Sequence, residues 1–230
     1  MNGRSPAYEI AVWLIPLIIA IVFHEVAHGY VARLFGDETA ARRGRLTLNP
    51  IRHVDPVGTV VVPMILALAH APIFGWAKPV PVVAARMRRP RLHMAIVALA
   101  GPATNLVLAA LTALAIGGMI GANFVELPRA GIGGFIAANL VNFLLINVFL
   151  AIFNLLPVPP FDGGHVVEAL LPRSLARHYA KLGRFAFPVM IALLVLLPAI
   201  SPRADVVARV VGPIADAVTG MFLALARAII

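Results

Sequence analysis

The chain of 230 residues is 61% hydrophobic and only 13% charged, and its mean hydropathy is +0.93. This number of charged residues is too small to cover the surface of a water-soluble globule of this size. The composition therefore indicates a membrane protein. The formal net charge of +9 does not favour nucleic-acid binding, because the basic residues lie between apolar runs, as the positive-inside rule describes. Cysteine is absent, so any metal must be bound by His, Asp or Glu.

Long apolar runs recur along the whole sequence. A helix that crosses a bilayer core of about 30 Å needs roughly 20 apolar residues. Five segments are suitable: residues 9–33, 93–120, 135–157, 184–200 and 205–230. A sixth stretch, residues 57–76, contains Pro63 and Pro72, so it could cross, kink or only dip into the membrane. The pattern predicts an all-α polytopic membrane protein with five or six transmembrane helices in a single domain, residues 1–230.

Basic residues flank the sixth stretch on both sides. Residues 33–52 carry five arginines, and residues 78–91 carry one lysine and four arginines. Basic loops of this kind are typically cytoplasmic, so both flanks are predicted to lie in the cytoplasm. A short extended or re-entrant segment would reconcile the two flanks, and a true sixth span is the alternative. The ends of the helices that carry the motifs below are then predicted to face the cytoplasm.

The first apolar segment contains the sequence His24-Glu25-Val26-Ala27-His28. Residues four apart project from one face of a helix, so His24 and His28 can share a metal ion, while Glu25 is offset by about 100°. Ionisable groups inside a membrane helix are costly, and their presence there indicates a function. We therefore predict that His24 and His28 bind a metal. The alternative is a structural histidine pair.

A catalytic zinc site needs a third protein ligand and an open position for water. The best candidate follows the third apolar segment, in Asn154-Leu-Leu-Pro-Val-Pro-Pro-Phe-Asp162-Gly-Gly-His165. The prolines end the helix and the glycines permit a tight turn, which would present Asp162 at the end of a rigid element. We predict that Asp162 completes the metal site. The alternative is that Asp162 only caps a short helix at residues 163–171.

These motifs together resemble those of the site-2 protease family of intramembrane zinc metalloproteases. That family combines H-E-x-x-H on one membrane helix with N-x-x-P-x-x-x-x-D-G on a later one. The second motif is matched position by position by Asn154, Pro157, Asp162 and Gly163. The resemblance extends through Gly44-Arg-Leu-Thr-Leu-Asn-Pro50, Gly75-Trp-Ala-Lys-Pro-Val-Pro-Val82 and Gly101-Pro-Ala-Thr-Asn105. We find no PDZ-like insertion or CBS-like tail, so the chain resembles a compact branch.

The resemblance implies one Zn2+ per chain, with His24, His28 and Asp162 as ligands and Glu25 as the catalytic acid and base. Zinc would acidify a water, and Glu25 would take its proton and later protonate the leaving amine. The expected activity is hydrolysis of a peptide bond in or near a transmembrane segment of another membrane protein. The expected setting is the bilayer of a prokaryotic cell, without nucleic acid. The alternative function is a metal or ion transporter that uses the same histidines and aspartate.

Such a substrate is itself a membrane helix, whose carbonyls are tied up in hydrogen bonds, so cleavage requires local unwinding. Residues 75–83, with Pro79 and Pro81, could present an extended edge to the unwound chain, or they could form an ordinary proline-rich loop. The family resemblance implies that Asn105 and Asn154 are polar groups near the site that contact the substrate. For Asn105, a hydrogen bond to a neighbouring helix is the alternative.

Overall fold

The computed structural model describes residues 5–68, 75–121, 131–201, 203 and 205–228, which form helices, turns and extended segments without a β-strand. Within this part of the chain, five helices are long and apolar enough to cross a membrane, which confirms the predicted fold class. They are α1 (Pro6–Leu34), α4 (Pro90–Gly121), α5 (Gly131–Asn154) and the composite helices Arg173–Ile200 and Val207–Arg227.

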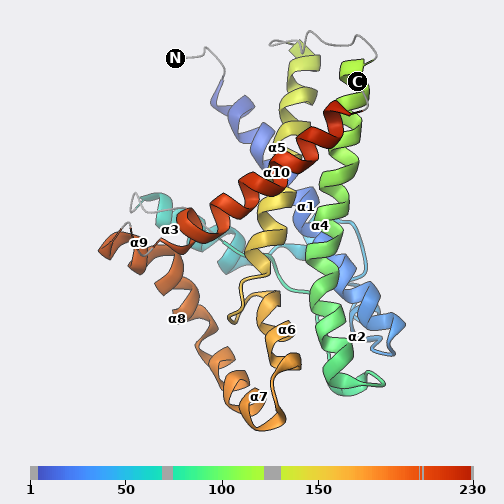
Figure 1. Cartoon of the computed structure of the whole chain (residues 1–230), viewed down its shortest axis with the longest axis vertical. Coiled ribbons are helices and arrows are strands. Elements are labelled where there is room, and N and C mark those ends of the chain that lie inside the picture. The colour runs from blue at the N-terminus through green and yellow to red at the C-terminus, as the bar shows by residue number, and fades with distance from the viewer. Residues whose placement is uncertain (1–4, 69–74, 122–130, 202, 204, 229–230) are drawn as a thin grey trace.

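Short helical elements complete the described chain (Figure 1). Those between α1 and α4 are α2 (Thr39–Arg42), η1 (Pro50–His53), η2 (Pro56–Val61), α3 (Val62–Leu68) and η3 (Ala84–Arg86). Those after α5 are α6 (Asp162–Leu170), α7 (Arg173–Ala180), η4 (Lys181–Phe185), α8 (Ala186–Ile191), η5 (Ala192–Leu196), α9 (Leu197–Ile200), η7 (Val207–Val211) and α10 (Gly212–Arg227). The helix of the fourth span therefore begins at Arg173, whereas the sequence predicted a start near residue 184. Its basic first part is helical because Arg, Leu and Ala favour helices.

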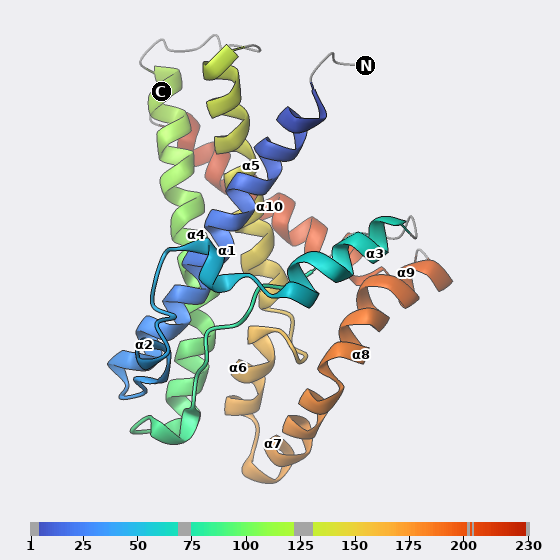
Figure 2. The same cartoon turned by 180° about the vertical axis from the view of Figure 1, so that it is seen from behind.

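The helices α1, α4 and α5 form the centre of the molecule, and α10 crosses α4 and α5 (Figures 1 and 2). Small residues make these contacts close. Ala109 and Ala113 of α4 are fully buried in one cluster with Leu144 and Val148 of α5 and Ala226 of α10. Small side chains allow helices to approach in a membrane, where burial from water does not drive their association. The packing places α4 against both α1 and α5.

A proline interrupts the hydrogen bonding of α1, and α5 compensates for it. Pro16 has no N–H to donate to the carbonyl of Val12, four residues earlier. The side-chain amide of Asn142 in α5 donates to this carbonyl at 2.7 Å. An unpaired carbonyl in an apolar environment is costly. Asn142 therefore replaces the bond that Pro16 removes, and it ties α5 to the first half of α1.

The sixth apolar stretch folds back on itself. Its first part is a short apolar helix, Pro56–Leu66. The N–H of Trp76 donates to the carbonyl of Gly58 at 3.1 Å, and the hydroxyl of Thr59 donates to the carbonyl of Trp76 at 2.9 Å. The two ends of the stretch therefore lie side by side, as the re-entrant path predicts. Residues 69–74, at the tip, lie outside the described residues.

The buried carboxylate of Asp37 joins the end of α1 to the extended residues 75–83. Asp37 accepts the backbone N–H groups of Thr39, at 3.0 Å, and Val83, at 2.5 Å, and also the hydroxyl of Thr39. Burial raises the pKa of Asp37, but these donors and the charge of Arg86 outweigh burial and lower it. Asp37 therefore stays ionised at neutral pH and stabilises the junction.

We expect Asp37→Asn to lower the free energy of unfolding by about 1–3 kcal/mol, because the buried donors lose a charged acceptor. Glu38→Gln is the matched control, since the neighbouring carboxylate is exposed and its ion pair with Arg42 contributes less than about 1 kcal/mol. Thermal unfolding in detergent, followed by circular dichroism at neutral pH, compares the two variants. Equal melting temperatures for them would contradict this role of Asp37.

The same comparison has an expected pH dependence. Because the folded-state pKa of Asp37 is lowered, its contribution to stability is present above the unfolded-state pKa of about 4. This contribution disappears as the pH falls through the folded-state pKa. The melting temperatures of wild type and Asp37→Asn should therefore converge in acid, and a constant difference would contradict the assignment.

Candidate metal centre

The two predicted histidine ligands of α1 meet Asp162, the first residue of α6. The Nε2 atoms of His24 and His28 lie 3.1 Å and 3.4 Å from Asp162 Oδ2 and 3.0 Å from each other. The three possible ligand atoms all lie within 4.8 Å of one another. The structure thus brings together two motifs that are far apart in the sequence.

Hydrogen bonds on the far side of each imidazole fix which nitrogen carries the proton. The Nδ1 atom of His24 lies 2.6 Å from Asn105 Oδ1, and that of His28 lies 2.7 Å from the carbonyl of Val97. Asn105 is oriented in turn because its Nδ2 donates to Asn147 Oδ1 at 2.8 Å. Both partners of the histidines are acceptors, so each Nδ1 carries a proton and each Nε2 presents a lone pair.

The atoms that converge are therefore all acceptors: two imidazole nitrogens and one carboxylate oxygen. Asp162 Oδ2 is buried and accepts no hydrogen bond from the described residues. Such a set is unfavourable without a positive charge at its centre. Two histidines and a carboxylate with a further position open are the donor set of catalytic zinc, so the residues present fit this ion.

Asp162 is held toward the histidines by the start of α6. The residue at the cap position is Phe161, and the capping role considered for Asp162 is not observed, since its side chain lies at the histidines instead. A side chain on Gly163 would collide with the backbone of Leu155 and Leu156, so glycine at this position permits the tight turn.

Gly101 gives the two histidines their room against α4. A Cβ atom at this position would lie 2.6 Å from His24 Nε2 and closer still to His28 Nε2. Real Cβ atoms do not approach other atoms so closely, so any larger residue would displace the ligand atoms. Glycine at this position therefore lets the backbone of α4 lie directly against the proposed metal ligands.

Glu25 lies on the same helix as the histidines and is partly buried. Its Oε2 atom accepts the backbone N–H of Val80 at 2.7 Å. Val80 belongs to residues 75–83, which have no helix or strand. The predicted extended segment therefore passes beside the predicted catalytic carboxylate.

The two predicted asparagines occupy different environments. Asn105 is fully buried, and its amide bonds both His24 and Asn147, so the alternative of contacts to neighbouring helices is the one observed. Asn154 lies in the last turn of α5, where its Nδ2 donates to the carbonyl of Leu150 at 3.0 Å. The substrate contacts of both asparagines stay predictions.

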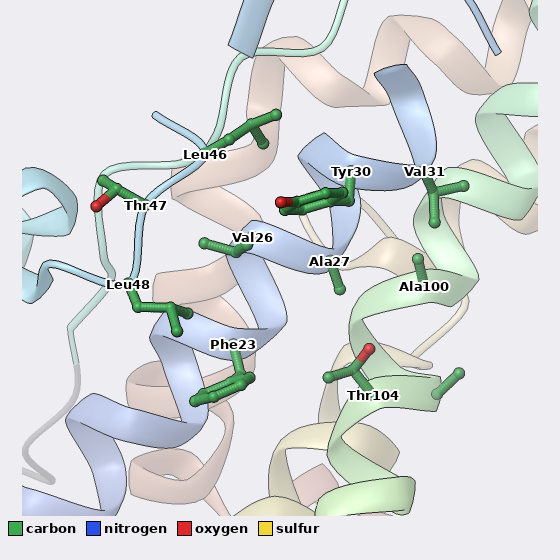
Figure 3. A pocket seen from close by; sticks show the side chains of 11 residues that line it. Phe23, Val26, Ala27, Tyr30, Val31, Leu46, Thr47, Leu48, Ala100 and Thr104 are labelled. Carbon is green, nitrogen blue, oxygen red and sulfur yellow. The ribbon is translucent and has the colours of Figure 1, made fainter. Parts of the chain in front are cut away.

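An apolar hollow of about 620 Å³ lies between α1, α4 and residues 46–48 (Figure 3). Phe23 and Tyr30 of α1 line it together with Ala100 and Thr104 of α4. The side chains of the metal centre do not belong to its lining. We therefore treat this hollow as separate from the catalytic chemistry.

We expect Gly101→Ala to weaken zinc binding by about 10- to 100-fold, the range for changes that disturb the groups around metal ligands. Gly118→Ala is the matched control, because Gly118 lies on the same helix with no atom within 4 Å of the added methyl group. Zinc per chain, measured at a series of buffered free zinc concentrations, tests this expectation. Unchanged zinc affinity in Gly101→Ala would refute the close contact.

Comparisons with known proteins lead to zinc metalloproteases. The profile of Peptidase family M50 matches residues 115–197. A Bacillus subtilis protein named "Putative zinc metalloprotease YwhC" is 38% identical over 184 residues, 79% of each chain. Proteins named "Putative zinc metalloprotease Rip2" from Mycolicibacterium smegmatis and Mycobacterium tuberculosis H37Rv are 33% and 32% identical over 81% and 84% of this chain, and 66% and 68% of their own.

No solved structure matches the chain. The matching relatives carry the names of proteases, so the transporter alternative gains no support. The similarity to the Bacillus subtilis protein covers most of both chains, and the profile match includes Asp162. The chain therefore belongs to peptidase family M50, the site-2 protease family.

Proposed function

We propose that this zinc metalloprotease hydrolyses a peptide bond in or near a transmembrane segment of another membrane protein. The observation that carries the proposal is the convergence of His24, His28 and Asp162 among membrane-spanning helices, with Glu25 beside the first histidine. Ionisable groups in such helices are retained for a function at that depth. A substrate segment that lies in the same membrane can reach these groups.

The residues have distinct roles in the proposed reaction. His24, His28 and Asp162 would hold the zinc ion, which supplies acidification of a water and polarisation of the scissile carbonyl. Glu25 takes the proton of the attacking water and then gives a proton to the leaving amine. The three ligands would hold the ion, and Glu25 is the residue that transfers the proton.

Residues 75–83 are proposed to guide the substrate. A membrane helix must unwind before its carbonyl can be attacked, because that carbonyl otherwise accepts a hydrogen bond within the helix. The segment is extended, and its Val80 lies beside Glu25. An extended chain next to the general base supports a role in holding an unwound substrate alongside it.

We propose that the site faces the cytoplasmic side of a prokaryotic cell membrane. Exposed arginines lie in the last turn of α1, at Arg33, and between α1 and α4, among them Arg43, Arg88 and Arg89. Positive charge at the ends of membrane helices is typical of the cytoplasmic side. His28 lies near this end of α1, so the charge supports a site close to the cytoplasmic boundary.

The test of this function is cleavage of a quenched fluorogenic peptide with one apolar span that is interrupted by Asn and Gly. Glu25→Gln should lower kcat by at least about 100-fold while zinc content stays at the wild-type level, because the base contributes proton transfer and no metal ligation. Glu9→Gln, an exposed change at the start of the same helix, is the matched control.

Two outcomes would contradict the proposal. Retained turnover in Glu25→Gln would refute the role of Glu25. Equal rates for the membrane peptide and for a water-soluble peptide with the same cleavable stretch would refute the membrane substrate.

We expect Asp162→Ala to lose most of its bound zinc, because two histidines alone leave the site without its third ligand. Glu168→Ala, on the same helix α6, is the matched control and should retain about one zinc per chain, since Glu168 is not among the proposed ligands. Elemental analysis after dialysis against buffer without zinc measures both. Equal zinc content in the two variants would remove Asp162 from the site.

A further inference from the structure

The contact between Glu25 and Val80 is a backbone hydrogen bond to the proposed general base. The N–H of Val80 donates to Glu25 Oε2 at 2.7 Å, and Val80 is only 7% exposed. Its neighbours Pro79 and Pro81 have no N–H. In the tripeptide Pro79-Val80-Pro81, Val80 is therefore the residue with a backbone N–H to donate.

Groups on both sides of Val80 hold the segment in place. The guanidinium of Arg45, which is buried, donates through Nη2 to the carbonyls of Lys78 at 2.6 Å and Pro79 at 3.3 Å. On the other side, the N–H of Val83 donates to Asp37. The segment is thus fixed before and after Val80 by charged side chains, independently of Glu25.

A glycine on α1 allows this close approach. A Cβ atom on Gly29 would lie 2.8 Å from Val80 Cγ1 and would also collide with Leu46. Gly29 is one turn beyond Glu25 on the same helix, so the free space lies next to the hydrogen bond. A side chain at Gly29 would therefore press on the side chains of Val80 and Leu46 next to this hydrogen bond.

We infer that the backbone N–H of Val80 is a positioning group that holds the carboxylate of Glu25 for proton transfer. With Oε2 engaged by Val80, Oε1 is the oxygen left to receive the proton of the water. A glutamate side chain has several rotatable bonds, and fixing it beforehand removes the cost of ordering it during the reaction. The inference rests on the proposed role of Glu25 as general base.

Val80→Pro tests the inference because it removes the N–H and keeps the segment extended. We expect kcat for the fluorogenic membrane peptide to fall by roughly 10- to 100-fold, a part of the gain that acid–base catalysis provides. KM should change by less than about threefold, and zinc per chain should match wild type, because the metal ligands are untouched. Val80→Ala keeps the N–H and should recover most of kcat.

A second variant removes the donor without adding a ring. Replacement of the Val80 amide N–H by an ester oxygen, through incorporation of the α-hydroxy analogue of valine, changes one atom of the backbone. It should reproduce the loss of kcat seen in Val80→Pro. This variant decides the question if Val80→Pro loses zinc or fails to fold.

Several outcomes would overturn the inference. Wild-type kcat in the ester variant would show that the N–H does not position Glu25, and a higher kcat would show that the contact restrains it. A loss of kcat in Val80→Ala together with wild-type kcat in the ester variant would assign the effect to the side chain. A failure of the proposed function is recognised separately, because wild type would then be inactive or Glu25→Gln would remain active.

Discussion

Three acceptor atoms that face one another among apolar helices impose the strongest constraint on this structure. Two imidazole nitrogens of α1 and an oxygen of Asp162 lie within 3.4 Å of one another, an arrangement that a cation stabilises. The supports of this arrangement come from α4: Asn105 and Val97 fix the protons of the imidazoles, and Gly101 leaves room for them. A helix that supplies no ligand therefore determines the geometry of the ligands.

The need to pair polar groups explains most of the polar contacts among the helices. Asn147 orients Asn105, which orients a ligand, so two asparagines form a chain from α5 to the metal centre. Outside the spans, Asp37 satisfies backbone donors where α1 ends and the extended segment turns away. These side chains form their hydrogen bonds within the protein. The remaining surface of the helices can therefore be apolar, as contact with lipid requires.

Local signals in the sequence predicted the membrane spans, and they selected the three residues His24, His28 and Asp162 that the structure brings together. Run length determines whether a helix can cross, and a spacing of four places His24 and His28 on one face. The predicted start of the fourth helix was wrong. The basic residues before residue 184 indicated a loop, but they favour a helix, which begins at Arg173. The contacts of Val80 and Val97 could not be predicted, since backbone N–H and C=O groups occur along the whole chain and only tertiary packing selects their partners.

Pro16 makes the helix that carries the histidines dependent on a helix that is synthesised later. During translation α1 enters the membrane long before α5, and until then the carbonyl of Val12 lacks the amide of Asn142. Asp162 follows α5 directly in the chain, so the missing hydrogen bond and the missing ligand arrive at nearly the same time. A nascent chain thus has neither a fully bonded first helix nor a complete metal site until most of the protein has been inserted.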